Sequence, residues 1–471
     1  LFLFTSVWRR QEVDLNGDDF SELTRLRQVS GGANAFWSPT DEIDLELNVH
    51  AVQEYRRGGD RLDQPPHEAD IAEELQTERL QGQLRFKHNV SPQLDYQLAY
   101  AMAFTDRRSY YGGGGFSADP QPPPAGAAES RYEEFLDEWE AQQVALGGYG
   151  RTLNPVHTGD AHVNTYLGVE RPMVLTVGGQ FQVDDIEDRY LGYEREIDVV
   201  YTVVGGYLQH NWLFADWGES VVGLRVDQHS EVDEPIFSPR LALMFTPLSI
   251  VRLRTSLSAG FRAPQAFDED LHIEVVGGAA RVITNAPGLE VERSWSAAQQ
   301  VALELDLADG WNVRSGVNGF ATLLQDAFVT NERDDPTTPE EEVVRENRGT
   351  TTVWGAEIEA GASYRNIWSM RLGWTMEYAA NDEPDEDFGQ RRLFRTPLHY
   401  GYLETQALLA DRLQFQAGLD ITGPMLVPHY DAEGDPFDEV ERSPWFFDLS
   451  FNLSTQFVGD DGVFLEPFVG M

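Results

Sequence analysis

The sequence contains no cysteine among its 471 residues. Disulfide bonds, thiol catalysis and cysteine-ligated metal sites are therefore excluded. It also contains no run of 18 apolar residues, so it encodes no transmembrane helix. A hydrophobic content of 41% and a mean hydropathy of −0.40 are typical of soluble proteins. They do not exclude a membrane, because a barrel strand needs only every second residue to be apolar and crosses in about 9–11 residues.

Positive charge is scarce. The 35 Lys and Arg residues face 79 Asp and Glu residues, which gives a formal net charge of −44 and a pI near 4.4, and Lys87 is the only lysine. Nucleic acid is a very poor partner for such a chain. Two interpretations of the acidity stay open: an external surface of an envelope protein, or a salt-loving organism whose high salt screens the repulsion between carboxylates.

Apolar and polar residues alternate along most of the chain, as expected of β-strands with one apolar face. Between residues 413 and 422, Leu413, Phe415 and Leu419 fall on one face, and Gln414 and Gln416 fall on the other. The same pattern recurs at 43–50, 251–262 and 447–454. It fits either a soluble β-sandwich or a membrane barrel.

The connections between these strands favour the barrel, because short and long ones alternate. The short connections lie at 38–40, 91–93, 171–172, 246–248, 308–310, 410–412 and 459–461. The long ones lie near 12–21, 55–75, 107–157, 185–196, 229–236, 262–293, 329–350, 380–392 and 423–443. Short turns on one rim and long external loops on the other are typical of outer-membrane barrels.

We therefore predict an all-β fold, a transmembrane antiparallel β-barrel that forms one domain over residues 1–471. We expect about nineteen strands, with the first and last running in the same sense. An odd count and ends that lack terminal signals suggest a fragment clipped at both ends. For residues 116–150, which are rich in proline and then in acidic residues, we expect a mobile external loop, with a short helix as the alternative.

The sequence carries no motif of an enzyme active site that we recognise, so we expect no catalytic residues and no enzymatic activity. His157 and His162 lie five positions apart near a strand start, which fits lumen or loop residues better than a metal pair.

One segment has the spacing of a calcium loop. Asp14, Asn16 and Asp18 set oxygen ligands two residues apart, the Phe20 carbonyl comes next, and Glu22 follows. Asp19 stands where calcium loops have glycine, and Arg25 stands where they have a bidentate glutamate. A structural calcium ion is therefore one interpretation, and an ordinary Asn-Gly turn between two strands is the other.

Two further stretches resemble a known family. The segment Gly260-Phe261-Arg262-Ala263-Pro264, followed by Asn285-Ala286-Pro287-Gly288-Leu289-Glu290-Val291-Glu292, is similar to a signature in a large external loop of TonB-dependent receptors. It departs from the signature by the inserted Ala286 and by Val291 in place of proline. Matches at 56–60, 65–67, 109–112 and 237–240 resemble a Bacteroidetes-type siderophore and cobalamin receptor subgroup.

The resemblance implies a 22-stranded barrel filled by an N-terminal plug, which is absent from this sequence. It implies import of a scarce, bulky solute across the Gram-negative outer membrane, most simply a ferric siderophore or similar iron complex. The implied partners are outer-membrane lipid, the TonB complex acting through the plug, a small-molecule metal chelate and a surface lipoprotein. A passive porin-like channel and a barrel subunit of a larger envelope complex are the alternatives.

Basic and aromatic residues of three long loops are the candidate ligand contacts, because these loops follow strands of one sense and should share a rim. The candidates are Arg56, Arg57, His67, Arg107, Arg108, Tyr110, Tyr111, Arg262 and His272, with Arg61 as a further cation. Arginine suits an anionic ligand in an acidic mouth. The alternative for each is charge balance with a neighbouring carboxylate.

Overall fold

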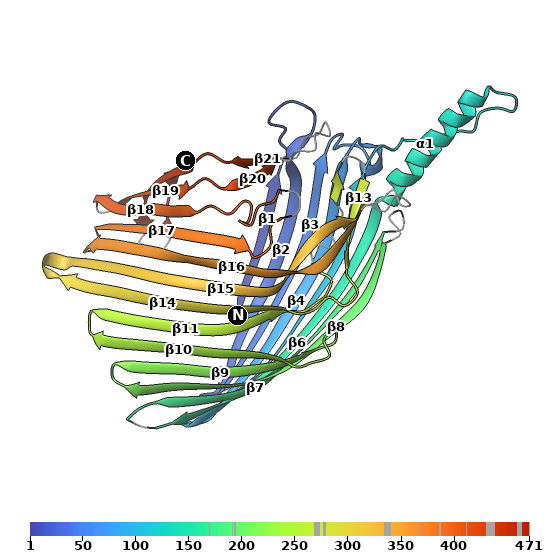
Figure 1. Ribbon diagram of the computed structural model, residues 1–471. Helices are drawn as coiled ribbons and strands as arrows, with labels where there is room; N and C mark the ends of the chain where they lie inside the picture. The colour runs from blue at the N-terminus through green and yellow to red at the C-terminus, as the bar shows by residue number, and fades with distance from the viewer. Residues whose placement is uncertain are drawn as a thin grey trace.

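Figure 1 shows the computed structural model, in which most of the chain forms one large, curved wall of β-strands. The structure describes residues 1–168, 170–190, 192, 195–267, 274–276, 279–333, 341–365, 367–385, 388–410, 412–429, 439–458 and 464–470. No helix within these residues is long and apolar enough to cross a membrane.

Within the described residues, the main sheet contains 21 strands. The strands of the wall are, in chain order, β1 (Phe2–Arg10), β2 (Ser21–Thr40), β3 (Ile43–Gly59), β4 (Ala72–Ser91), β5 (Leu94–Gly112), β6 (Tyr149–Leu167), β7 (Met173–Tyr190), β8 (Arg195–Ala215), β9 (Gly218–His229), β10 (Ile236–Leu248), β11 (Val251–Arg262), β14 (Glu292–Leu307), β15 (Trp311–Arg333), β16 (Glu341–Tyr364), β17 (Trp368–Asn381), β18 (His399–Ala410), β19 (Leu413–Thr422), β22 (Phe446–Thr455) and β25 (Phe468–Gly470).

Each strand of this series pairs with the next in antiparallel sense, from β1–β2 through β11–β14 and β19–β22 to β22–β25. The other two of the 21 strands, β12 (Glu274–Val276) and β13 (Ala279–Asn285), belong to one loop, so the wall has the expected nineteen strands. Because the number of antiparallel strands is odd, the first and last strands of the wall run in the same sense. The prediction of a large antiparallel barrel wall is confirmed.

The remaining elements lie in the connections. They are η1 (Pro66–Glu68), α1 (Glu129–Gly147), η4 (Ala308–Gly310), β20 (Leu426–His429), β21 (Glu439–Arg442), β23 (Phe457–Val458) and β24 (Phe464–Leu465).

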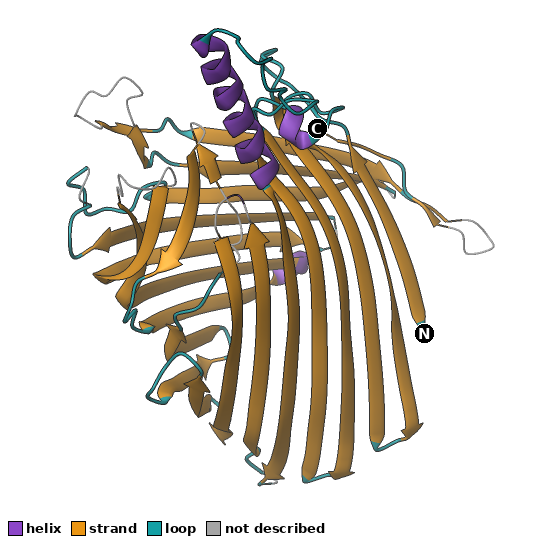
Figure 2. Ribbon diagram, turned by 90° about the vertical axis from the view of Figure 1, so that its right-hand side faces the viewer, coloured by secondary structure: helices purple, strands orange, loops and turns teal. Residues whose placement is uncertain are grey.

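Short and long connections are sorted between the two rims, as predicted, and Figure 2 shows the long loops together with α1 at the upper rim. Two more short connections join β8 to β9, between Ala215 and Gly218, and β16 to β17, between Tyr364 and Trp368. The expected loop bounds were too wide, because the strands continue further toward the long-loop rim. For example, β16 already begins at Glu341, inside the loop expected at 329–350.

The wall has an apolar and a polar face. Leu419 pairs with Leu449, Ala417 with Phe451 and Phe415 with Leu453, while Gln416 pairs with Asn452 and Asp420 with Asp448. On the polar face, Asn48, His50, Gln81 and Gln83 line a hollow, which marks this face as the concave, lumenal one. The predicted lipid-facing and lumen-facing sets therefore lie on opposite faces of the wall.

Aromatic residues form bands on the apolar face. At the short-turn rim Trp311 packs against Tyr364 with ring centroids 5.0 Å apart, and toward the long loops Trp354 packs against Tyr378 at 5.8 Å. Trp354 and Tyr364 are ten positions apart on β16. At about 3.3 Å per residue and a tilt of about 40°, this spacing covers about 25 Å, the height of the apolar band of an outer-membrane barrel. The part of β16 before Trp354 consequently extends beyond the membrane.

The prediction of a mobile loop over 116–150 is wrong for Glu129–Gly147, which form the 19-residue helix α1. Glu, Ala, Leu and Gln are strong helix formers, and Glu129 in the first turn interacts favourably with the helix dipole. Figures 1 and 2 show α1 projecting away from the wall at the long-loop rim.

Most of the buried side chains lie at this same rim. Tyr110, Tyr190, Asp188 and Ile236 are each at most 1% exposed, and all stand near the loop-side end of a strand. A wall one sheet thick has lipid on one side and the lumen on the other, so its side chains become buried only where loops fold over it. Packing is therefore concentrated where the long loops meet the wall.

Candidate functional site

The candidate site is the long-loop rim, and β5 shows how its two faces differ. Leu98, Tyr100, Met102 and Phe104 are exposed on the apolar face, so alternation places Arg108 and Tyr110 on that face as well. Arg107, Ser109 and Tyr111 lie on the lumenal face. The expectation that Arg107 and Arg108 both point over the lumen is wrong, because neighbouring residues of a strand face opposite sides.

On the lumenal face, buried polar side chains of four neighbouring strands form a network. The Thr152 hydroxyl donates to Asp188 Oδ1 at 2.6 Å, and Arg195 Nη2 lies 3.1 Å from Asp188 Oδ2. The Ser109 and Tyr190 hydroxyls are hydrogen-bonded to each other. Burial raises the pKa of Asp188, opposed by the hydrogen bond from Thr152 and the charges of Arg195 and Arg107. Burial likewise raises the pKa of Tyr190 to about 12, so this tyrosine is neutral at physiological pH.

Arg107 lies close enough to this network for its charge to act on Asp188. Its Nε is shielded from solvent and has no hydrogen-bond partner, and no ion pair involves its guanidinium among the residues the structure describes. Arg56 of β3 shares the lumenal face, pairs with Glu54 at 3.2 Å and has a side chain that is 43% exposed. Both residues are partly exposed, which makes them the candidate cations for a ligand on the lumenal side of the rim.

A second cluster lies on the outer face, where η1 folds over the rim. Arg57 is fully buried, donates to the carbonyls of Gly58 at 2.7 Å and Asp60 at 3.3 Å, and lies 4.0 Å from Glu74. Burial lowers the pKa of Arg57, an effect that the charge of Glu74 opposes. The structure thus gives Arg57 a role in holding the loop between β3 and β4, and places it away from the lumen.

Aromatic rings complete this outer cluster. Tyr110 packs against Tyr149 with centroids 4.6 Å apart, and His67 Nδ1 is 2.9 Å from the Tyr149 hydroxyl. Gly115 N donates to the His67 carbonyl at 2.8 Å. Tyr110 and His67 therefore join two long loops to each other outside the lumen, which corrects the expectation that they face it. Arg61 pairs with Asp70 at 2.9 Å in the same loop, as its charge-balance alternative predicted.

The loop between β11 and β14 contains the family signature and is called the signature loop. Arginine side chains that pack on an aromatic ring hold it on the lumenal side. The Arg262 guanidinium lies 3.6 Å from the centroid of Phe267, and that of Arg345 lies 4.6 Å from the same ring. Ala266 N donates to the Tyr201 hydroxyl at 2.8 Å, and Asn285 Nδ2 donates to the Gln265 carbonyl at 3.1 Å. His272, another candidate, lies outside the described residues.

Sequence reasoning missed Arg345 and Tyr201, which position this loop. Arg345 is 2% exposed and donates to Asn285 Oδ1 at 3.2 Å. It stands two residues before Asn347, whose Nδ2 donates to the Glu290 and Asp326 carbonyls. The local sequence gives no signal for either residue, because each lies far along the chain from the part of the loop that it contacts.

The three long loops that carry the candidates lie on one rim. η1 contacts both β5 and α1, and β12 of the signature loop contacts β5. The signature loop thus reaches from β11 across to the strand that carries Arg107. The predicted topology of these loops is confirmed, while their ligand contacts stay predictions.

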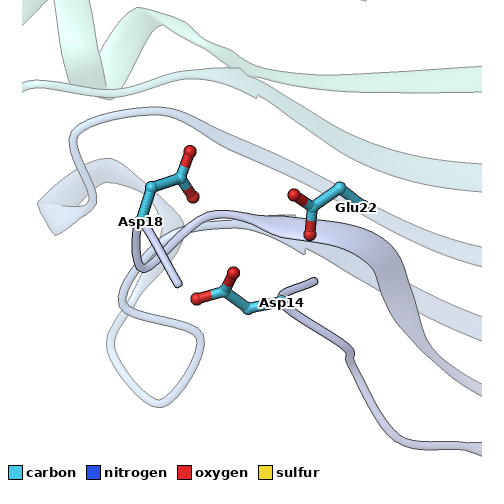
Figure 3. Close-up of side chains that lie close together, drawn as sticks. All are labelled: Asp14, Asp18 and Glu22. Atoms are coloured by element: carbon cyan, nitrogen blue, oxygen red, sulfur yellow. The ribbon is translucent and has the colours of Figure 1, made fainter. Parts of the chain in front are cut away.

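The loop between β1 and β2 brings together the predicted calcium ligands Asp14, Asp18 and Glu22 (Figure 3). Their carboxylate oxygens lie within 4.8 Å of one another, and all three side chains are exposed. Asp14 accepts hydrogen bonds from the amides of Gly17 at 2.6 Å and Asp19 at 3.0 Å, which lower its pKa, the Gly17 contact most. Asn16 Oδ1 and Asp18 Oδ1 accept from the amides of Asp18 and Phe20. These contacts fit both the calcium and the turn interpretations.

An ion pair closes the base of this loop. Arg25 Nη2 donates to Glu12 Oε1 at 2.7 Å and to Asp63 at 3.1 Å. The hydrogen bond with Arg25 lowers the pKa of Glu12 to about 2. Arg25 therefore has a structural role in closing the loop. It stands where calcium loops have a bidentate glutamate, and it offers no ligand to a cation.

A separate cavity of about 680 Å³ lies on the lumenal face toward the short turns. Arg252, Arg314, Glu304, Glu359 and Arg371 are among its lining residues, and Arg314 pairs with Glu304 at 3.1 Å. Mixed charges of this kind are typical of a water-facing barrel interior. None of the candidate ligand contacts lines it.

Comparisons with solved structures support the fold. A siderophore receptor, PirA from Acinetobacter baumannii, superposes with a TM-score of 0.66 at 15% identity, over 93% of this chain and 65% of that one. A variant of the ferric enterobactin receptor PfeA from Pseudomonas aeruginosa gives 0.68 at 13% identity, over 94% and 64%. The hemophore receptor HasR of Serratia marcescens, in complex with its hemophore HasA and heme, gives 0.65 at 12% identity, over 92% and 66%. The chain thus spans about two thirds or less of the length of these structures.

No curated protein sequence matches the chain. The sequence does match the family described as TonB dependent receptor-like, beta-barrel, over residues 9–458. This match covers nearly the whole wall, from the end of β1 to β23. The chain therefore belongs to the TonB-dependent receptor β-barrel family, whose members lie in the outer membrane of Gram-negative bacteria.

Proposed function

We propose that this chain is the barrel of an outer-membrane receptor that imports a scarce, bulky solute, most simply a ferric siderophore or similar iron complex. The family match over residues 9–458 is the observation that carries the proposal. The siderophore, ferric enterobactin and hemophore receptors among the structural neighbours support an iron-containing cargo. The role is transport, and we assign no catalytic residue.

Capture takes place at the lumenal face of the long-loop rim. Arg56 and Arg107 are partly exposed there, and guanidinium groups suit an anionic chelate because they donate charge-assisted hydrogen bonds. The surrounding acidity opposes an anion, and salt weakens that opposition by screening. A habitat of high salt is therefore a consistent part of the proposal.

Release into the periplasm requires energy, which the TonB complex supplies through a plug domain. The mixed charges of the lumenal cavity near the short turns give such a plug polar groups to contact. Outer-membrane lipid surrounds the apolar face. The proposal also includes a surface lipoprotein as a partner and membership of the Bacteroidetes-type subgroup.

Uptake by the full-length receptor tests this function. Cells that lack their own iron receptors are made to express it and are given radioactive iron as catecholate, hydroxamate or carboxylate complexes. We expect saturable uptake of one class, and its loss when TonB is deleted. Uptake that is unsaturable and independent of TonB indicates a passive porin instead. Lack of uptake together with stable co-purification of a large partner indicates a barrel subunit of an envelope complex.

We also propose that the loop 14–22 binds a calcium ion through Asp14, Asn16, Asp18, the Phe20 carbonyl and Glu22. The gathering of three carboxylates within 4.8 Å supports it, because oxygens that repel one another are stabilised by a hard cation. Such an ion has a structural role in ordering the loop.

A further inference from the structure

The helix α1 is firmly held at its C-terminal end. Gln142 is 3% exposed, accepts a hydrogen bond from Phe116 N at 2.7 Å and donates to the Phe116 carbonyl at 3.2 Å. Ala145 is 1% exposed, and Gly147 packs so closely on Gly192 that a Cβ there would clash. The direction of the helix is thus fixed by packing of its last turns against the rim.

The other half of α1 extends away from the rim and carries an uncovered apolar stripe. Tyr132, Phe135, Leu136 and Trp139 are spaced by three and four residues, which places them on one face of the helix. Tyr132, Leu136 and Trp139 are 37%, 57% and 49% exposed. Among the residues that the structure describes, the one polar contact of this stripe is the hydrogen bond that the Tyr132 hydroxyl donates to the Pro124 carbonyl.

Carboxylates cover the rest of this half. Glu133, Glu134, Asp137, Glu138 and Glu140 are all exposed, and Arg131 is the one basic residue of α1. Exposing an aromatic stripe to water is energetically unfavourable. Such an exposed stripe on a firmly held helix is typical of a surface that binds another molecule. Because the carboxylates that border the stripe are negatively charged, a surface that binds the stripe should be positively charged at its edge.

We propose that α1 is a docking arm for another protein at the cell surface, one that offers an apolar groove bordered by lysine and arginine. Amphipathic helices bind such grooves through residues spaced like Tyr132, Leu136 and Trp139. A second copy of this chain fits poorly, because each copy carries a formal net charge of −44 and the same acidic border. An anionic membrane surface repels the helix for the same reason.

Site-specific cross-linking in the full-length receptor tests the arm. A photoreactive phenylalanine replaces Leu136 on living cells of the source organism, and a matched control carries it at Glu134, on the opposite side of the helix. The protein that cross-links is purified, and its affinity for the receptor is measured by interferometry. The variant Leu136→Ala with Trp139→Ala is compared with Glu134→Gln, since alanine preserves the helix.

We expect position 136 to cross-link to one surface protein and position 134 not to. The double alanine variant should bind it at least tenfold more weakly, Glu134→Gln should change affinity less than twofold, and added salt should weaken binding. Three results overturn the proposal: equal or no cross-linking at both positions, cross-linking to a second copy of this chain, or binding to phosphatidylglycerol vesicles that the alanine variant loses. An unchanged affinity of the double variant also overturns it.

Discussion

Leu419 of β19 lies directly opposite Leu449 of β22, and the next pair on the same face joins Ala417 to Phe451. The residues between them, Gln416 and Asn452, pair on the other face. The apolar residues of these two neighbouring strands therefore lie on the same face of the sheet. That agreement identifies the lipid-facing surface.

A charge on this surface should be costly. We expect Phe451→Arg to lower the free energy of unfolding by about 2–4 kcal/mol, because arginine on the lipid face must enter the hydrocarbon layer. Asn452→Arg, one residue further and facing the lumen, should have a much smaller effect. Equilibrium unfolding of the full-length receptor from lipid vesicles measures both. Equal losses for the two variants would contradict the assignment of faces.

Much of the wall follows from sequence because alternation is a local property. The strands at 43–50, 251–262, 413–422 and 447–454 were predictable, since lipid and water select opposite residues along every one of them. The same rule separates Arg107 from Arg108, and the error there came from treating strand residues as a loop. The parts of the strands that extend beyond the membrane have no lipid-facing residues, so they lack the alternating pattern. On sequence alone these parts are therefore assigned to the long loops.

Other features depend on contacts between distant segments. Arg57 is buried because the loop that contains η1 folds back over the outer face, which no local pattern encodes. The helix α1 was mistaken for a mobile loop because a proline-rich stretch precedes it and most of its residues are polar. Arg262 and Arg345 are more than eighty positions apart in the sequence, yet both contact the Phe267 ring.

Acid should loosen the loop between β1 and β2 only at unusually low pH. The pKa of Glu12 is lowered from 4.5 to about 2 by its hydrogen bond with Arg25. A lowered pKa stabilises the folded loop fully above pH 4.5, and this contribution is lost as the pH falls toward 2. Pepsin cleavage near residues 11–20 should therefore accelerate over that range.

Glu12→Gln provides the control for this acid effect. The variant should be cleaved faster at pH 4.5 and show little further change on acidification. A wild-type loop whose cleavage is insensitive to pH between 4.5 and 2 disagrees with a structural role for this ion pair.

Calcium should order the loop 14–22. Isothermal calorimetry with calcium chloride should detect binding to the full-length receptor, and Asp18→Ala should abolish it, because a carboxylate ligand is removed. Calcium–oxygen distances of about 2.3–2.6 Å are expected. Asp19→Asn is the matched control, since Asp19 has φ of 71° and asparagine tolerates that conformation. If Asp18→Ala leaves both calcium binding and protease resistance unchanged, the loop is only a turn.

The signature loop should depend on Tyr201. Tyr201→Phe removes the hydroxyl that accepts the hydrogen bond from Ala266 N, at a cost of about 0.5–1.5 kcal/mol. Limited proteolysis within residues 262–293 should become several times faster. Tyr207→Phe removes a hydroxyl that contacts Asp160 elsewhere in the lumen and should leave this cleavage unchanged. Equal cleavage rates in wild type and Tyr201→Phe would show that the loop is held by other contacts.

The central claim is that cargo is captured on the lumenal face of the long-loop rim, and Arg107 and Arg108 offer its most direct test. They are adjacent in sequence and face opposite sides of β5. Binding of the ferric chelate that the full-length receptor imports is measured by calorimetry for Arg107→Gln and Arg108→Gln, with both barrels shown to be folded by their heat-modifiable mobility. The account predicts that Arg107→Gln weakens binding about tenfold or more, as for a lost charged hydrogen bond, while Arg108→Gln leaves it unchanged. Weaker binding only in Arg108→Gln, or unchanged binding in Arg107→Gln, would contradict it.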